Sequence, residues 1–184
     1  MEAENLRRVI AIIGRPNVGK SSIFNRIAGR TLSIVHTERG VTRDRLIRAV
    51  TWEGNHFEMI DTGGLESPGQ SLSEIAQGVA QQAEIAMQDA AAILFVTNAE
   101  TGLVPQDEEV AALLRRHNRP VFVAINKADH SGRDTVASEF ERLGFPVFPI
   151  SALHYRGFEP LMNAALAVLP PPEANPTIGN PLRV

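Results

Sequence analysis

The sequence predicts an α/β fold built on a mostly parallel sheet with helices on both faces. Two observations indicate this. Short apolar runs, most of them rich in β-branched residues or phenylalanine, alternate with longer segments of helical character. Strands that alternate with helices form crossover units, whose sheet is buried on both faces. In addition, polar motifs directly follow several of these runs, at the edge of a parallel sheet where ligands bind.

Six apolar runs are the expected strands, because they are short and most end in Gly, Asp or Asn. They are residues 9–13, 46–52, 57–60, 91–97, 121–125 and 147–150. Four segments are the expected helices, on the basis of their helical character and apolar spacing. They are residues 22–28, 106–117, 134–143 and 158–169. The segments at 30–43 and 63–73 are polar or contain Gly and Pro, so we expect loops there.

Composition excludes several classes of protein. The 184 residues suit one domain, and 43% hydrophobic residues are enough to bury a core. Without cysteine, disulfide frameworks, thiolate catalysis and cysteine zinc sites are excluded. A net charge of −3 is not typical of a domain that binds nucleic acid by general electrostatics. No apolar run is long enough to span a membrane and the charged N-terminus is not a secretory signal, so we expect a cytoplasmic domain without membrane contact. We also expect the isolated domain to be monomeric.

A phosphate-binding loop follows the first expected strand and precedes a helix. The pattern G-x-x-x-x-G-K-[ST] is met at every fixed position. Its residues are Gly14, Arg15, Pro16, Asn17, Val18, Gly19, Lys20 and Ser21, followed by Ser22 in the helix. Glycines let backbone N–H groups approach phosphates, and the helix N-terminus favours an anion. Lys20 would reach the β- and γ-phosphates, and the Ser21 hydroxyl would ligate Mg²⁺.

A D-x-x-G motif, Asp61, Thr62, Gly63 and Gly64, follows the third expected strand. An acidic residue at a strand end opposite the phosphate loop can hold Mg²⁺ through water. The Gly64 N–H can meet a γ-phosphate oxygen, a contact that exists only with a triphosphate and can order the loop behind it. Thr42 is the candidate for a second hydroxyl ligand of Mg²⁺; a β-branched residue entering a strand is the alternative interpretation.

A base-reading motif, N-K-x-D, follows the fifth expected strand and consists of Asn126, Lys127 and Asp129. The Asp129 carboxylate can accept hydrogen bonds from N1–H and the 2-amino group of guanine. Adenine has no such donor pair, so the carboxylate would discriminate against it. Asn126 and the aliphatic stem of Lys127 would hold the loop and cover the base.

A shorter motif, Ser151, Ala152 and Leu153, follows the sixth expected strand. A backbone N–H of this segment would face the O6 atom of guanine. A serine N-cap for the helix at 158–169 is the alternative interpretation, and the sequence does not distinguish the two.

Together these motifs resemble those of the Der (EngA) family of bacterial ribosome-assembly GTPases, and most closely its first G domain. The resemblance spans residues 9–169, and its T-R-D-R and D-T-G-G versions separate the family from the similar Era and MnmE G domains. The segments that carry it are 14–21, 40–45, 61–64, 126–129 and 151–152. It implies a three-layer P-loop NTPase fold, the Ras-like G domain, that binds GTP or GDP with Mg²⁺.

The resemblance also implies slow, potassium-stimulated GTP hydrolysis. Leu65 stands where Ras-like GTPases place a water-orienting glutamine, and leucine cannot polarise water. In relatives of this kind, K⁺ near the phosphate loop offsets transition-state charge, and Asn17 matches its ligand. An ordinary turn residue is the alternative for Asn17. Lys20, Thr42 and Gly64 are the residues expected to act in hydrolysis.

The resemblance further implies a larger protein. Der-like proteins carry two G domains in tandem and a KH-like domain, and they act on the large ribosomal subunit or its precursor. We therefore expect a G domain over 1–169 and a proline-rich linker over 170–184 that leads to a second G domain. Three positions depart from the family pattern: Arg39 replaces a proline, Asn98 replaces a frequent aspartate, and Tyr155 interrupts a His-Gly-Arg-Gly sequence.

Two other functions stay open at this point. An ATP-using kinase or ATPase would share the phosphate loop, but N-K-x-D disfavours it. A nucleotide-binding regulatory module with negligible hydrolysis, beside a second catalytic G domain, is compatible with Leu65. Nucleotide competition tests the former, and a hydrolysis rate tests the latter.

Overall fold

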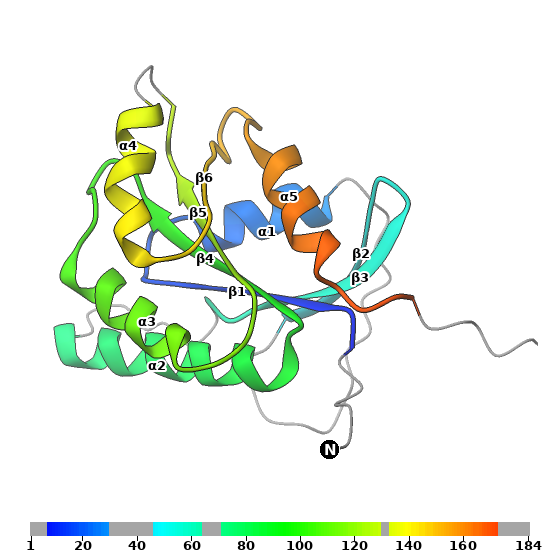
Figure 1. Ribbon diagram of the computed structural model, residues 1–184, viewed down its shortest axis with the longest axis horizontal. Coiled ribbons are helices and arrows are strands. Elements are labelled where there is room, and N and C mark those ends of the chain that lie inside the picture. The colour runs from blue at the N-terminus through cyan, green and yellow to red at the C-terminus, as the bar shows by residue number, and fades with distance from the viewer. Residues whose placement is uncertain (1–6, 30–45, 64–70, 130–132, 173–184) are drawn as a thin grey trace, which may run out of the picture.

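A single six-stranded sheet in the order β2-β3-β1-β4-β5-β6 organises the molecule (Figure 1). The computed structural model describes residues 7–29, 46–63, 71–129 and 133–172. The strands are β1 (Val9–Gly14), β2 (Leu46–Trp52), β3 (Asn55–Asp61), β4 (Ala92–Asn98), β5 (Val121–Asn126) and β6 (Val147–Pro149). β2 pairs antiparallel with β3, and the other four pairs are parallel. The predicted mostly parallel sheet is thus confirmed.

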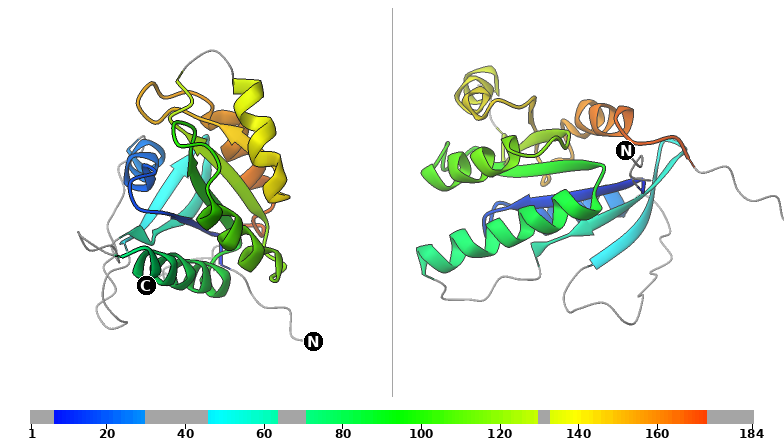
Figure 2. Two further views of the ribbon diagram at one scale, coloured as in Figure 1. Left: turned by 90° about the vertical axis from the view of Figure 1, so that its left-hand side faces the viewer. Right: turned by 60° about the horizontal axis from the view of Figure 1, so that its bottom comes forward.

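Helices cover both faces of this sheet. They are α1 (Lys20–Ala28), α2 (Leu72–Asp89), α3 (Pro105–Arg115), α4 (Arg133–Phe140) and α5 (Phe158–Ala167), with a 3-10 turn, η2 (Glu141–Leu143), after α4. α1 and α5 pack on one face, and α2, α3 and α4 on the other (Figures 1 and 2). The predicted three-layer architecture is confirmed.

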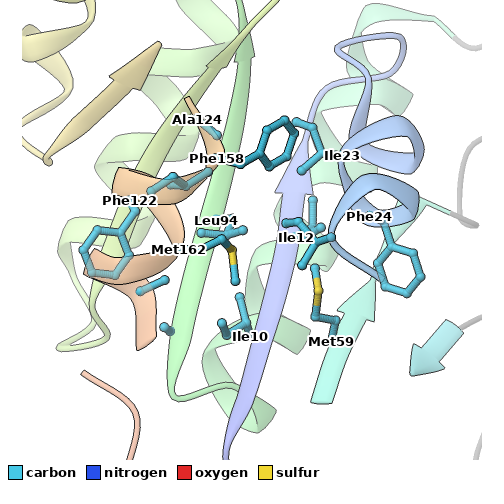
Figure 3. Packing of buried hydrophobic residues seen from close by; sticks show 14 of the residues in the cluster. Ile10, Ile12, Ile23, Phe24, Met59, Leu94, Phe122, Ala124, Phe158 and Met162 are labelled. Atoms are coloured by element: carbon cyan, nitrogen blue, oxygen red, sulfur yellow. The ribbon is translucent and has the colours of Figure 1, made fainter. Parts of the chain in front are cut away.

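The central strand β1 contributes side chains to both halves of the core, because successive strand side chains point to opposite faces. Ile10 and Ile12 pack with α1 and α5, whereas Ala11 and Ile13 pack with α2 and α3. Figure 3 shows the first half, where Ile12 lies beside Ile23 of α1 and the strand side chains meet those of α5. All six residues of β1 are buried, as expected for a parallel strand covered on both faces.

Helix α2 is the one long element in the described residues that the sequence analysis missed. Its buried residues are Val79, Gln82, Ala83, Ala86 and Met87, so only two large apolar side chains mark its inner face. The overlooked signal is a capping box, in which Ser71 Oγ accepts from the Glu74 N–H and Glu74 Oε2 accepts from the Ser71 N–H. These bonds lower the pKa of the Glu74 carboxyl. The helix begins at Leu72, within the segment expected to be a loop.

The parallel strands bring their carboxyl ends to one edge of the sheet. β1 ends at Gly14, β3 at Asp61, β4 at Asn98 and β5 at Asn126, and each of these residues belongs to or borders a polar motif. The site is therefore assembled at this edge, as the topology requires. None of the helices that the structure describes is long and apolar enough to cross a membrane.

Candidate nucleotide-binding site

The phosphate loop connects the end of β1 to the start of α1. Asn17 and Gly19 have positive φ angles, 64° and 96°. A Cβ atom on residue 19 would lie 2.2 Å from Nδ2 of Asn126, so this close approach requires glycine. The phosphate loop therefore packs directly against the base-reading motif.

Lys20 reaches back across its own loop. Its Nζ donates hydrogen bonds to the carbonyl oxygens of Gly14 (2.9 Å) and Arg15 (2.7 Å), and the residue is 4% exposed. These bonds hold the ammonium group within the loop, where the N-terminus of α1 adds its own partial positive charge. An anion on the loop would meet both charges, as predicted for a phosphate group.

Asp61 lies at the end of β3, and the residues that follow it approach the Lys20 side chain. Its Oδ1 accepts from the Gly63 N–H (2.9 Å), and a Cβ on Gly63 would lie 3.2 Å from Lys20 Cε. In the described part of the chain, Oδ2 of this buried carboxylate has no hydrogen-bond partner, so it is available as an oxygen ligand. Ser21 is an exposed residue in the first turn of α1. A carboxylate and a hydroxyl beside a phosphate loop fit Mg²⁺, which binds oxygen ligands and keeps water.

Two side chains form hydrogen bonds with the backbone of β1 at the point where its pairing with β3 ends. The last β1–β3 pair is Ile12 with Asp61. Beyond it, the Thr62 hydroxyl donates to the Ile12 carbonyl (2.6 Å), and Gln82 Oε1 accepts from the Gly14 N–H (3.3 Å). Gln82 is 1% exposed and comes from α2, so this helix holds the entrance of the phosphate loop. The sequence analysis missed Gln82; its signal was a polar residue among the small side chains of an amphipathic helix.

Asn126 joins the phosphate loop to both base-reading loops. Its Nδ2 donates to the Val18 carbonyl (2.9 Å), and its Oδ1 accepts from the Ala152 N–H (3.1 Å). These two bonds link the phosphate loop to the 151–153 turn through Asn126. Because the Ala152 N–H is engaged here, the neighbouring Leu153 N–H is the donor without a partner within the described residues.

The Ser151 side chain does not cap the last helix. The N-cap of α5 is Gly157. Ser151 Oγ instead accepts from the His154 N–H (3.0 Å), and its backbone pairs with Arg156. Ser151 thus shapes the turn that carries Ala152 and Leu153, and the N-cap interpretation is wrong.

A pocket of about 510 Å³ lies between the phosphate loop and the base-reading motifs. It is lined by Gly19, Ser22, Asn25, Arg26, Asn126, Lys127, Asp129, Ala152 and Leu153. Asp129 Oδ1 is buried and has no hydrogen-bond partner among the described residues. The Lys127 ammonium is held outward by Glu100 (3.2 Å), a half-exposed pair of small energetic weight, which leaves the lysine stem along the pocket.

Arg15 points away from this pocket. Its Nε donates to Asp107 Oδ1 of α3 (2.8 Å), and Asp107 is fully buried. Burial raises the pKa of the Asp107 carboxyl, and the Arg15 guanidinium partly offsets the rise. Asp107 Oδ2 also accepts from the Val104 N–H at the start of α3 (3.4 Å). Since its guanidinium is engaged on α3, Arg15 can serve a nucleotide only through its backbone.

We expect Asp107→Ala to lower the free energy of unfolding by about 3 kcal/mol, because it leaves the Arg15 guanidinium without its buried partner. Chemical denaturation measures this loss. The control is Glu108→Ala, which removes an exposed ion pair with Arg142 and costs under about 1 kcal/mol. Equal stabilities of the two variants would show that the buried pair contributes nothing beyond a surface pair.

The structure brings most of the predicted site residues together at one edge of the sheet. Gly19, Asn126, Asp129, Ala152 and Leu153 line one pocket. Asp61 lies at the same edge of the sheet, at the end of β3. Asn17 lies exposed on the loop. Thr42, Gly64 and Leu65, together with Arg39, lie outside the described residues.

Comparison with known proteins gives one consistent family. Residues 9–127 match the family model described as 50S ribosome-binding GTPase. GTPase Der of Syntrophotalea carbinolica is 47% identical over 165 residues, which are 89% of this chain and 37% of that protein. GTPase Der of Limosilactobacillus reuteri is 44% identical over 168 residues, 91% of this chain and 38% of that protein. The chain thus spans little more than a third of these relatives, and the match confirms the resemblance stated above.

Solved structures of GTPases share the fold. Era of Aquifex aeolicus, bound to GDP and AlF₄⁻, superposes with a TM-score of 0.68 at 30% identity, covering 90% of this chain and 57% of that one. A structure of Era with MgGDPNP and nucleotides of 16S ribosomal RNA gives a TM-score of 0.69 at 29% identity, covering 92% and 59%. These matches confirm the G-domain architecture.

Proposed function

Because the chain belongs to the family of 50S ribosome-binding GTPases, we propose that it binds GTP and GDP with Mg²⁺ and hydrolyses GTP. One observation carries the choice of base. Asp129 Oδ1 is buried in the wall of the pocket and lacks a partner among the described residues. A buried acceptor without a donor is costly, and guanine supplies N1–H and its 2-amino group. Adenine leaves the acceptor unmet, which disfavours an ATP-using enzyme.

The reacting phosphates would lie on the loop that Lys20 crosses. Hydrolysis forms a bond from a water oxygen to the γ-phosphorus and breaks the bond to the bridging oxygen, so negative charge grows on the phosphates. The Lys20 ammonium and the loop N–H groups would stabilise this charge. Mg²⁺, which supplies further positive charge when bound, would be held by Ser21 and Asp61. Thr42 as a second hydroxyl and Gly64 as a γ-phosphate donor are part of the same proposal.

We further propose that the reaction is slow and that potassium stimulates it. Asn17 is exposed on the phosphate loop with a left-handed backbone, which leaves its amide oxygen free of the core. Leu65 cannot orient water, so a cation near the loop would supply transition-state stabilisation that a glutamine supplies in Ras-like proteins.

The cellular role would be that of a switch in the assembly of the large ribosomal subunit. Relatives that carry the name GTPase Der support this, and the matches cover 37% and 38% of the two described above. A second G domain and a KH-like domain in the same protein, reached through a linker at 170–184, would act with this domain. We expect it to be monomeric and cytoplasmic.

A regulatory module with negligible hydrolysis is the second candidate, and Leu65 is compatible with it. Such a module would use the same pocket, so binding alone does not separate the two functions. The rate of phosphate release does.

We expect the domain to release phosphate from GTP with Mg²⁺, not from ATP, and faster in potassium chloride than in matched sodium chloride. The physical reason is charge compensation at the loop by K⁺, so Asn17→Ala should remove the salt difference and leave the sodium rate unchanged. Phosphate release measured in both salts, for wild type and variant, checks this.

Each part of this experiment has its own contradicting result. Equal turnover of ATP would refute base reading by Asp129. Equal rates in the two salts would refute the role of Asn17. No turnover in either salt, with GTP still bound, would replace the enzyme by the regulatory module.

A further inference from the structure

The turn that carries Ala152 and Leu153 is anchored from outside by an arginine of α1. Arg26 Nε donates to the Ala152 carbonyl (2.7 Å), and its NH2 group donates to the Leu153 carbonyl (3.0 Å). Both are charge-assisted bonds from one planar group, and such bonds are stronger and more directional than neutral ones. Arg26 also lines the pocket.

An aromatic stack supports the same guanidinium. Its carbon lies 5.9 Å from the ring centroid of Tyr155, and this ring stacks on Phe158 of α5 at 5.2 Å with an interplanar angle of 11°. Phe158 is 2% exposed, so the stack rests on the core. Tyr155 has a φ of 54°, which is uncommon for an aromatic residue. Its two ring contacts offset that backbone cost, at the position where the family pattern has glycine.

Because the peptide bond is planar, an anchor on the Ala152 carbonyl also fixes the direction of the next N–H group. The Ala152 carbonyl and the Leu153 N–H belong to one peptide unit, and in a trans peptide they point in opposite directions. By holding the carbonyl, Arg26 fixes the direction of the N–H. In the described part of the chain, that N–H has no hydrogen-bond partner, and Leu153 lines the pocket.

We propose that Arg26, supported by Tyr155, is a positioning residue for guanine recognition that aims the Leu153 N–H at the 6-position of the base. The inference rests on the proposed function. Asp129 would read the N1–H and 2-amino edge, and the Leu153 N–H the 6-oxygen. Discrimination at the 6-position then depends on a residue of α1 that belongs to none of the sequence motifs.

The test compares GDP with 6-thio-GDP, which keeps N1–H and the 2-amino group but replaces the 6-oxygen by a weaker acceptor. Wild type should prefer GDP by about tenfold, a typical effect of one buried hydrogen bond. Arg26→Ala should weaken GDP binding by about tenfold and bring the preference close to one.

Two variants separate positioning from folding. Arg48→Ala removes the same charge and a similar ring contact, with Phe24 of α1 at 5.3 Å, and should leave the preference for GDP unchanged. Arg26→Lys keeps the charge but cannot hold both carbonyls, so its preference should lie between those of wild type and Arg26→Ala. It also supplies the test if Arg26→Ala does not fold.

An unchanged preference for GDP over 6-thio-GDP in a folded Arg26→Ala or Arg26→Lys variant overturns the proposal. Failure of the proposed function looks different, because wild type would then bind ADP as well as GDP. A wild type that selects guanine over adenine, with Arg26 variants that keep the preference for the 6-oxygen, rejects the positioning role alone.

Discussion

Lys20→Ala is expected to lower the affinity for GTP by about a thousandfold, equivalent to about 4 kcal/mol. Lys20 is 4% exposed, and its ammonium group donates to the carbonyl oxygens of Gly14 and Arg15. Without it, those carbonyls lose a donor and the phosphates lose their nearest fixed charge, so the loop presents oxygen atoms to an anion. Calorimetric titration with a non-hydrolysable GTP analogue measures the loss.

Two further variants identify the charge as the cause. Lys20→Met keeps the aliphatic stem and should lose as much affinity as Lys20→Ala. Arg142→Ala removes an equal charge from an exposed pair with Glu108, and it should leave the affinity unchanged. Unchanged GTP affinity in Lys20→Ala would refute the assignment of the phosphate loop.

The sequence predicted the sheet well because each buried strand is a continuous apolar run bounded by a polar motif. β1 and β5 are buried at all six positions, and no amphipathic helix has that pattern. α2 was missed because, beside Val79 and Met87, its buried face consists of two alanines and a glutamine, whose burial depends on the fit against β1. Apolar periodicity carries little information when the packing surface is small and partly polar.

The residues of the candidate site likewise fall into those that the sequence predicted and those that it did not. Residues within a contiguous motif, such as Lys20, Asp61 and Asn126, were predicted because the spacing itself encodes their chemistry. Residues that act across the fold were not, because nothing local marks them. Gln82 reaches the Gly14 N–H over 68 positions, and Arg26 reaches the Ala152 carbonyl over 126 positions. Such partners become visible only when the chain is folded.

These long-range contacts connect the two halves of the site. Asn126 joins the phosphate loop to the 151–153 turn, and a Cβ at Gly19 would collide with its amide. A change in one loop is therefore felt by the other, since packed loops respond as a unit. Base recognition and phosphate binding should accordingly be coupled.

Asp129→Asn is expected to reverse the base preference from guanine to xanthine. The wild-type Oδ1 is a buried acceptor without a partner among the described residues, which suits the two donors on the guanine edge. The amide has one acceptor and one donor, so it faces the 2-amino group with a donor and is left unpaired. Xanthine carries an oxygen at position 2, which accepts from that amide. We expect GDP affinity to fall by about a hundredfold or more and XDP affinity to rise by a similar factor.

The matched control is Glu100→Gln, which also replaces a carboxylate by an amide near the base. Glu100 pairs with Lys127 on the outside of the pocket and does not line it, so this variant should keep the preference for guanine. Competition between GDP and XDP for each variant gives the ratio directly. Retained guanine selectivity in Asp129→Asn would refute base reading by this carboxylate. A shift in both variants would mean that loss of charge near the pocket, rather than hydrogen-bond matching, sets the preference.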